Sequence, residues 1–302
     1  MGQKNQACLY YFIALMDRHE AEALLKQFGI SPKRSLGQSF LVDPKVIESV
    51  TKQAELTRED QVIEIGPGLG ALTKELSEKA GRVIAIEIDQ RLIPVLEHVL
   101  EHEQNTIIYH QDALKVNLNQ YSEDWNGSTL VVGSLPYYAT TPLIEKVICE
   151  LPKSRRLVFI MQKEAVDRIL SKPGSKTYGP TSVLIALYGT AKQSIMVSPH
   201  SFWPQPHVLS QVLIIDRLGK PQSDSDVKPV ALPEDVSLCF SFLHFLRQCF
   251  SQRRKKLIHT LPTRPDQSAE ALLTQCGLSP DIRPEQVAPE SYRLLFELCD
   301  LV

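Results

Sequence analysis

Apolar runs rich in β-branched residues recur along the first half of the chain, and glycine or polar residues bound each of them. Four such runs lie at residues 62–65, 82–89, 106–110 and 129–133. Runs of this length and composition predict buried strands. The segment at residues 69–80 has the spacing of an amphipathic helix. The pattern therefore predicts a strand, a tight turn and a helix over residues 62–80, as in an α/β protein.

Helical periodicity predominates near both ends of the chain. It predicts a charged helix at residues 17–28 and further helices at 238–250, 269–276 and 290–301. A polar, proline-bearing stretch at residues 220–226 predicts a linker. We therefore expect a small helical domain over residues 218–302, a larger domain over residues 31–217, and an N-terminal extension over residues 1–30.

The N-terminal extension contains an apolar stretch at residues 9–16 that loosely resembles the core of a secretion signal. No small-x-small cleavage site follows it, and it continues directly into the charged helix predicted at residues 17–28. We therefore expect a docked or frayed extension rather than a signal peptide.

The turn after the first apolar run is the densest glycine segment of the chain. Gly66, Gly68 and Ala71 match the relaxed dinucleotide fingerprint G-x-G-x-x-A. Glycines let the backbone approach a ligand closely, and the following helix offers N–H groups to an anion. The turn alone does not distinguish between nucleotide cofactors.

The residues that follow the other strands narrow the choice of ligand. Glu87 ends the second run, 21 residues after Gly66, and an acid there suits the ribose of NAD and of S-adenosylmethionine equally. Asp112 follows the third run, where it suits an adenine amine. The fourth run leads into Ser134-Leu135-Pro136-Tyr137. This tetrapeptide is similar to the [Asn/Asp/Ser]-x-Pro-[Tyr/Phe] motif with which N6-adenine methyltransferases hold their target amine.

Composition limits the number of domains and the kinds of partner that the chain can have. The 302 residues, 43% of them hydrophobic, suit one large or two ordinary globular domains. The net charge of −2 means that any affinity for RNA must come from local basic patches. No apolar run approaches the roughly 18 residues of a membrane span. The six cysteines have no metal-ligand spacing, so we expect reduced core residues of a cytosolic protein and no metal site: Cys8, Cys149, Cys239, Cys249, Cys276 and Cys299.

Three further segments carry a resemblance to a known family. Residues 33–43 resemble the K-R-x-x-G-Q-N-F-L-x-D opening of the ribosomal RNA adenine dimethyltransferases. Residues 202–208 are similar to the F-x-P-x-P-x-V loop of that family, and residues 250–257 to its F-x-x-R-R-K-x-L helix. The resemblance extends from residue 31 to the C-terminus. It is strongest to the bacterial enzymes that dimethylate N6 of two adjacent adenines near the 3′ end of small-subunit rRNA.

The resemblance implies a Rossmann-like class I methyltransferase domain of seven strands followed by the small helical domain. The fifth strand would lie at residues 157–161, and residues 193–197 and 211–215 would form a closing hairpin. Ligands of such a sheet bind at the carboxyl ends of its strands, where the strand order reverses. The implied cofactor is S-adenosylmethionine, with these residues in contact: Ser39, Leu41, Gly66, Gly68, Glu87, Asp112 and Ser134. The implied partner is the immature small ribosomal subunit, bound in the cytoplasm by a monomer.

The chemistry of adenine methylation explains why the tetrapeptide matters. The N6 lone pair is delocalised into the ring, so the amine is a poor nucleophile. Acceptors for both N–H protons would draw the nitrogen toward tetrahedral geometry, and positioning would supply most of the rate. The resemblance assigns these acceptors to the Ser134 side chain and the Leu135 carbonyl, and base stacking to Tyr137 and Phe202. The alternative for both aromatic residues is ordinary core packing.

Two departures from the family motifs leave other functions open. The family has Asn where this chain has Ser39 and Ser134. A hydroxyl on a shorter arm still accepts a hydrogen bond worth about 0.5–1.5 kcal/mol, which favours a slower enzyme over an inactive one. A noncatalytic ribosome-assembly factor with the same fold is the second hypothesis. A nicotinamide-dependent oxidoreductase is the third, but it has no catalytic residues at a recognisable spacing and leaves the tetrapeptide unexplained.

Basic residues gather in local clusters despite the slightly acidic whole. The clusters are Lys33-Arg34, Arg155-Arg156 and Arg253-Arg254-Lys255-Lys256. Such runs are most often solvated helix faces, but the methyltransferase motifs favour contacts with rRNA phosphates. Residues 172–179 are predicted to form a mobile loop beside the fifth strand that adds a further RNA contact.

Overall fold

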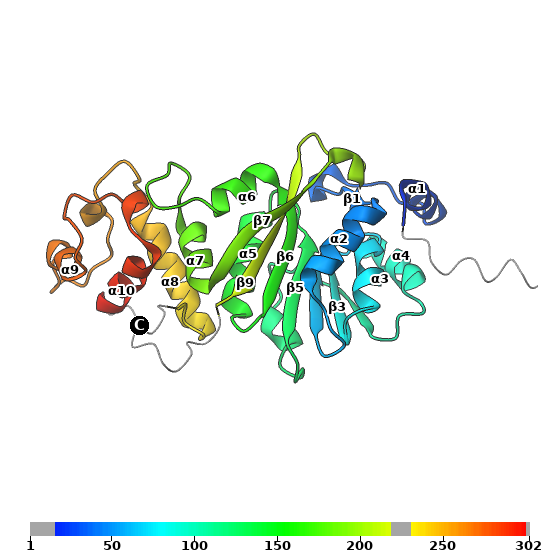
Figure 1. The fold of residues 1–302 in the computed structure, drawn as a ribbon, viewed down its shortest axis with the longest axis horizontal. Helices are drawn as coiled ribbons and strands as arrows, with labels where there is room; N and C mark the ends of the chain where they lie inside the picture. The colour runs from blue at the N-terminus through cyan, green and yellow to red at the C-terminus, as the bar shows by residue number, and fades with distance from the viewer. Residues whose placement is uncertain (1–15, 219–230, 300–302) are drawn as a thin grey trace, which may run out of the picture.

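The computed structural model describes residues 16–218 and 231–299, and a seven-stranded sheet forms its centre (Figure 1). The strand order is β4-β3-β2-β5-β6-β9-β7. The first five strands in this order are parallel, and β9 pairs antiparallel with both β6 and β7. The strands are β2 (Gln61–Ile65), β3 (Arg82–Glu87), β4 (Thr106–His110), β5 (Thr129–Ser134), β6 (Arg156–Gln162), β7 (Gly189–Val197) and β9 (Ser210–Arg217). The predicted strands, the closing hairpin and the Rossmann-like fold are thereby confirmed.

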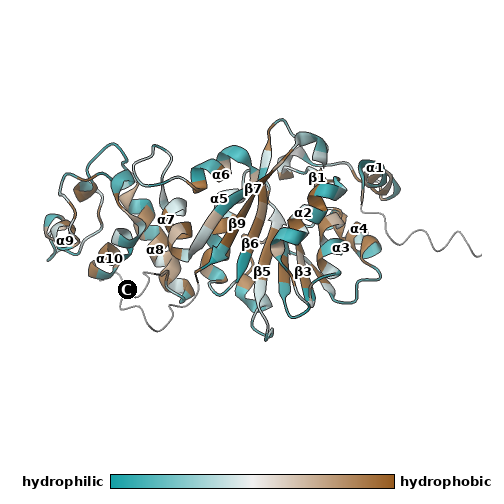
Figure 2. Ribbon diagram, in the orientation of Figure 1, coloured by the Kyte–Doolittle hydropathy of each residue, from teal (hydrophilic) through white to brown (hydrophobic). Residues whose placement is uncertain are grey.

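Each face of the sheet has its own hydrophobic core because successive side chains of a strand point to opposite faces. Val62 belongs to one core and Ile63 to the other. The Val62 face is covered by α1 (Arg18–Gln27), α2 (Pro44–Ala54), α3 (Ala71–Ser77) and α4 (Ile93–Val99). The Ile63 face is covered by α5 (Thr140–Glu150), α6 (Lys163–Ile169) and α7 (Pro180–Tyr188). Figure 2 shows the apolar residues concentrated in the strands between these helices.

The C-terminal helices continue the core of the Ile63 face. They are α8 (Val236–Cys249), α9 (Ala269–Gln275) and α10 (Pro289–Leu298), at the end of the molecule opposite α1 (Figure 1). Phe242, Phe245 and Phe296 form an aromatic cluster within this shared core. The predicted helical part is therefore present. The boundary at residues 217 and 218 stays a prediction, and the linker at 220–226 and the apolar stretch at 9–15 lie outside the described residues.

Aspartate residues cap the first turns of two helices. Asp17 caps α1 by accepting a hydrogen bond from the Glu20 N–H, and Asp43 caps α2 in the same way through the Lys45 N–H.

The five cysteines within the described residues are all free thiols. Four of them are buried, and Cys276 is partly exposed. None of the described helices is long and apolar enough to cross a membrane.

Two predictions about the RNA-facing segments are wrong. Helix α8 ends at Cys249, so residues 250–255 form turns after the helix, and Leu257 begins a 3₁₀ helix (Leu257–His259). The loop at residues 172–179 is not free beside β6, because Tyr178 is buried and its hydroxyl donates to the Val287 carbonyl at 3.1 Å. The Gly174 N–H donates to the Glu285 carbonyl at 2.6 Å. Burial of the Tyr178 ring in the helical core fixes this loop to the C-terminal helices.

Candidate active site

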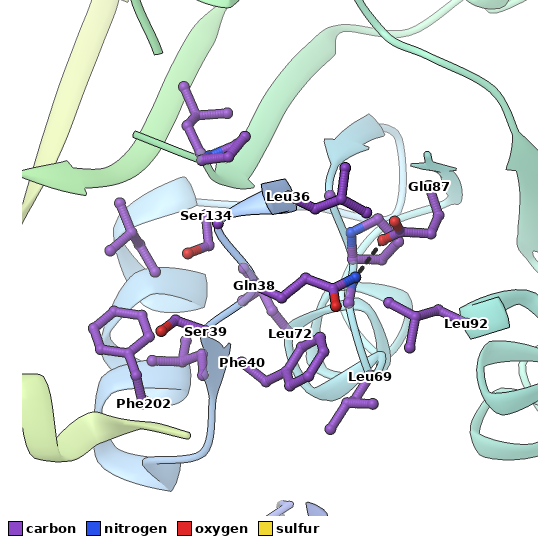
Figure 3. Close-up of a pocket in the computed structure, with 18 of the residues that line it drawn as sticks. Leu36, Gln38, Ser39, Phe40, Leu69, Leu72, Glu87, Leu92, Ser134 and Phe202 are labelled. Carbon is purple, nitrogen blue, oxygen red and sulfur yellow. Dashed lines mark hydrogen bonds between the residues drawn. The ribbon is translucent and has the colours of Figure 1, made fainter. Parts of the chain in front are cut away.

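A pocket opens at the carboxyl ends of β2, β3 and β5, where the strand order reverses. Strands β3 and β4 follow β2 in one direction across the sheet, and β5 and β6 follow it in the other. This is the position at which open α/β sheets bind ligands. Figure 3 shows Glu87 and Phe202 on opposite sides of the pocket, with Gln38 and Phe40 between them.

A second, two-stranded sheet covers the pocket and joins segments far apart in the chain. It pairs β1 (Phe40–Leu41) antiparallel with β8 (Phe202–Trp203), so that Leu41 lies opposite Phe202. The Ser39 hydroxyl donates to the Pro204 carbonyl at 2.6 Å beside this pair. The segments at residues 33–43 and 202–208, which both resemble family motifs, therefore meet over one cavity. No sequence pattern predicted this pairing, because each strand is only two residues long.

The glycine turn needs the conformations that glycine allows. Gly66 and Gly68 have φ angles of +74° and +61°, in the left-handed region. A Cβ atom at Gly68 would lie 2.9 Å from Cδ1 of Phe40. Since a methyl group would displace that ring, Gly68 sets the distance between the turn and the cover of the pocket.

Glu87 lies at the end of β3 and holds the glycine turn in place. Its carboxylate accepts hydrogen bonds from the Gly68 N–H at 3.1 Å and from the Asp89 N–H at 2.8 Å. Burial raises the pKa of Glu87 to about 7, against the effect of these two N–H groups. The predicted acid thus lines the pocket together with Gly66, Gly68, Ser39 and Leu41.

Glu64 is a second acid of the pocket, to which the sequence assigned no role. It lies in the middle of β2, is fully buried, and its Oε2 atom has no hydrogen-bond partner within the described structure. Desolvation raises the pKa of Glu64 to about 8 and outweighs the neighbouring Thr73 hydroxyl. Its place as a charged residue inside an apolar strand could have marked Glu64 as a functional residue, since carboxylates are almost never fully buried without a partner.

Gln38 connects the N-terminal loop to the strand that carries Glu87. Its amide donates to Asp89 at 2.8 Å and accepts from the Lys33 N–H at 2.6 Å. Asp89 also pairs with Arg91, and the Arg91 guanidinium lowers the pKa of Asp89 to about 2. This network fixes the loop that leads into β1, and no predicted role had been given to Gln38 or Asp89.

The tetrapeptide at residues 134–137 enters the pocket from the end of β5. The Leu135 N–H donates to the Ile160 carbonyl of β6 at 2.9 Å, which holds the backbone at this point. Tyr137 is 37% exposed, and its hydroxyl lies 3.4 Å from Oγ of the buried Ser210. Phe202 is buried and lines the same pocket. All four predicted catalytic residues are therefore brought together: Ser134, Leu135, Tyr137 and Phe202.

Asp112 is the one predicted cofactor residue that does not line this pocket. It follows β4, and its Oδ1 atom accepts a hydrogen bond from the Leu114 N–H at 2.9 Å within its own turn. Its role toward an adenine amine stays a prediction.

Comparison with known proteins places the chain in one family. The model of the ribosomal RNA adenine dimethylase family matches residues 29–300. A ribosomal RNA small subunit methyltransferase A from Geobacillus sp. (strain WCH70) is 38% identical over 282 residues, which cover 90% of this chain and 93% of the relative. The chain belongs to the ribosomal RNA adenine dimethylase family.

Solved structures support the fold of this dimethylase. A dimethyladenosine transferase from Plasmodium falciparum superposes with a TM-score of 0.67 at 22% identity and covers 87% of this chain and 98% of its own. The 23S rRNA methyltransferase ErmE superposes with a TM-score of 0.59 at 25% identity, over 86% and 99% of the two chains. The nicotinamide-dependent oxidoreductase hypothesis is set aside, because the match extends over the whole chain and not over the glycine turn alone.

The cofactor of the dimethylase family, S-adenosylmethionine, fits the groups of the pocket. The Glu64 oxygen without a partner is a buried polar atom in the pocket that a bound ligand would supply with a hydrogen bond. The Glu87 carboxylate suits a ribose, and the turn at Gly66 and Gly68 leaves room for a close backbone approach. We expect these residues to hold the cofactor.

The structure separates the predicted RNA-binding residues of the dimethylase into two groups. Arg156 is only 8% exposed and pairs with Asp216 and Glu55 at the amino end of β6. Arg155 beside it pairs with Asp60. Both lie at the edge of the sheet opposite the pocket, and acidic residues within the fold pair with their charges. Their role as RNA contacts stays a prediction, and the acids that pair with them are distant in sequence and were not recognised beforehand.

In the other clusters, Lys33, Arg254 and Lys255 are exposed. Lys33 is exposed and directly precedes the 3₁₀ turn at Arg34–Leu36, which leads into the pocket. Arg254 and Lys255 are exposed beside a shallow basic groove, whereas Lys256 pairs with Asp281 on its edge. Arg253 donates to the carbonyl of Lys176 at 2.8 Å and to that of Tyr178, so it holds the loop at 172–179.

Proposed function

We propose that this dimethylase transfers methyl groups from S-adenosylmethionine to N6 of two adjacent adenines near the 3′ end of small-subunit rRNA. The substrate is the immature small ribosomal subunit, and the protein acts on it as a monomer in the cytoplasm. Support for the small subunit comes from the Geobacillus relative, whose name states that subunit, and from the length of the match, 93% of the relative.

One observation carries the chemical part of the proposal. Ser134 and Tyr137 line the same pocket as Glu87 and Phe202, although these residues come from three strands and a loop. An acid suited to a ribose and a tetrapeptide suited to an aromatic amine therefore face one cavity. An enzyme that joins a nucleoside cofactor to an adenine needs these two subsites side by side.

The residues of the chain would prepare the amine for transfer. S-adenosylmethionine supplies an activated methyl group when it is bound. Ser134 Oγ and the Leu135 carbonyl would accept the two N–H protons of the adenine amine, which concentrates the lone pair on nitrogen. Tyr137 and Phe202 would hold the flipped-out ring between them. No strong base is required, because the proton leaves a cationic product and can pass to solvent.

A direct assay separates the enzyme from a noncatalytic assembly factor. Immature small subunits incubated with methyl-labelled S-adenosylmethionine should acquire four methyl groups on two adjacent adenines, read by mass spectrometry of the rRNA fragment. Subunits that already carry these groups are the control and should gain none. Binding of immature subunits without any methyl transfer would contradict the proposal and favour the noncatalytic factor.

A further inference from the structure

The tyrosine that follows the tetrapeptide has no role in the mechanism above. Tyr138 is 59% exposed, the largest exposure among the large hydrophobic side chains of the described residues. It lines the same pocket as Ser134 and Tyr137, at the start of the turn that leads into α5. Exposed aromatic rings beside a ligand site are a common means of recognition, whereas scattered exposed residues need no explanation. Its location at the pocket is therefore what distinguishes Tyr138.

The backbone around Tyr138 is held firmly. The Pro136 carbonyl accepts hydrogen bonds from the Ala139 N–H and from the Thr140 hydroxyl, both at 3.0 Å. On the other side, a Cβ atom at Gly37 would lie 4.0 Å from Cδ1 of Tyr138 and 3.6 Å from Cβ of Pro136. The ring thus lies near Gly37 of the N-terminal loop and is exposed to solvent over most of its surface.

A cation lies near the same turn. Arg168 of α6 is exposed, and its Nη2 atom is 3.4 Å from Oγ1 of Thr141, three residues after Tyr138. Within the described residues, no carboxylate forms an ion pair with Arg168, in contrast to Arg155 and Arg156. An exposed ring that lines the pocket and a guanidinium held near the same turn match the base and the phosphate of a nucleotide.

We propose that Tyr138 stacks on the base next to the target adenine, with Arg168 at the adjoining phosphate. The proposal rests on the proposed function, since it needs one base of a single strand inside the pocket. The neighbouring nucleotide of that strand must then leave the pocket at its rim, where Tyr138 and Gly37 lie. Stacking tolerates any base, so Tyr138 sets the position of the strand rather than its sequence. With two adjacent adenines, it holds one while the other is in the pocket.

Three variants test this positioning role. Tyr138→Ala should raise KM for immature small subunits about tenfold and leave kcat within about twofold, because the contact is made before transfer; tenfold corresponds to about 1.4 kcal/mol, within the range for one base–aromatic stack. Tyr138→Phe keeps the ring and should behave as the parent. Phe240→Ala is the matched control, because Phe240 is an exposed aromatic residue on α8, outside the pocket. A Phe variant as weak as the Ala variant would overturn stacking.

Binding measurements keep the test independent of turnover. Small subunits reconstituted with an abasic nucleotide beside the target should bind the parent about tenfold more weakly than unmodified subunits. Tyr138→Ala should not distinguish the two kinds of subunit, since the ring and the base form one contact. If the abasic nucleotide weakens subunit binding equally in the parent and in Tyr138→Ala, the proposal is overturned. If the parent transfers no methyl group, the proposed function fails, while the dissociation constants still decide whether Tyr138 stacks.

Discussion

Ser134 is one of the two residues of the pocket, with Ser39, at which this chain departs from the family motifs. It lies at the end of β5, and its hydroxyl is an acceptor on a shorter arm than the amide of asparagine. Ser134→Asn should therefore keep or raise kcat, whereas Ser134→Ala should lower kcat about tenfold, equivalent to about 1.4 kcal/mol in the barrier. The measurement is single-turnover methylation of immature subunits, so that product release does not mask the chemical step.

Thermal unfolding is the control for the Ser134 variants. Neither change enlarges a buried apolar cavity, so both variants should melt close to the parent. An Ala variant as fast as the parent would show that Ser134 is not the acceptor. The Leu135 carbonyl would then have to hold the amine alone.

Glu64 makes stability depend on pH in a defined direction. Its pKa is about 8 in the folded protein, compared with 4.5 as the ordinary value. Between these two pH values the folded chain keeps a proton that the unfolded chain releases, so the free energy of unfolding falls as pH rises. The slope contributed by Glu64 should approach 1.4 kcal/mol per pH unit within this window. Glu64→Gln should remove it, as measured by urea unfolding at pH 5, 6, 7 and 8.

Glu87 supplies the comparison for the Glu64 prediction. Its pKa is about 7, so its own slope should flatten above that pH, while the slope from Glu64 continues to about pH 8. Between pH 7 and 8 the parent should therefore still lose stability through Glu64, whereas Glu64→Gln should lose much less because Glu87 is then largely ionised. Identical slopes in the two proteins would mean that Glu64 ionises normally in the folded chain.

The location of single residues in the pocket was predictable where they lie at or directly after the end of a predicted strand. Glu87, Ser134 and the glycines of the turn end their strands, and the carboxyl ends of parallel strands meet at one edge of the sheet. Arg156 was not predictable, because its partner Asp216 lies 60 residues away on the antiparallel strand β9. A charge run in the sequence does not show which of its members are neutralised inside the fold.

At the scale of elements, the cover of the pocket depends on contact between the glycine turn and β1. Gly68→Ala should lower the free energy of unfolding by about 1–2 kcal/mol, because a left-handed backbone strains an L-residue. It should also weaken cofactor binding at least tenfold, since the new methyl group must displace the Phe40 ring. Calorimetric titration with S-adenosylhomocysteine measures the second effect.

Gly29 offers a matched control for Gly68. Its φ angle is +64°, and a Cβ atom there would meet nothing within 4 Å. Gly29→Ala should therefore show the same loss of stability and an unchanged affinity for the cofactor product. Equal affinities for Gly68→Ala and the parent would refute the idea that the turn and Phe40 set the shape of the pocket.

The long strands and capped helices followed from local sequence, but the short and irregular elements did not. The strand at residues 106–110 was predicted with the bounds that β4 has, since four consecutive apolar or β-branched residues followed by His110 lie between polar neighbours. The pair β1 and β8 has two residues in each strand and is fixed by its tertiary partners. In the same way, α8 ends at Cys249, and after the buried Phe250 a polar, basic stretch at residues 251–256 buries no side chain before Leu257.

At the scale of the whole molecule, the helical end and the methyltransferase sheet share one hydrophobic core. Leu243 and Phe242 of α8 belong to the same cluster as Ile144 of α5 and Ile63 of β2. Arg247 of α8 also pairs with the buried Glu145 of α5. Linker composition predicted a small helical domain after residue 217, but sequence does not reveal which of its helix faces meet the rest of the protein. The shared core instead holds the basic groove in a fixed orientation relative to the pocket.

The basic run after α8 therefore divides into residues that hold the fold and residues that face solvent. Replacing Arg254 and Lys255 together with Ala should weaken binding of immature small subunits and lower the salt slope by up to about two, because two phosphate contacts are lost. Arg253→Ala should instead lower the free energy of unfolding by about 1–2 kcal/mol, since two carbonyls lose a charged donor. Filter binding across a salt series and urea unfolding measure the two effects.

Affinity for the cofactor should stay at the parent value in both variants, because neither site touches the pocket. This control matters, since a general loss of folding would weaken cofactor and subunit binding together. A double variant with the parent's salt slope would show that Arg254 and Lys255 are only a solvated surface. An Arg253→Ala protein that is fully stable but binds subunits weakly would show that Arg253 leaves the loop carbonyls to reach RNA. The division between the two groups rests on which of these residues already has a partner within the fold.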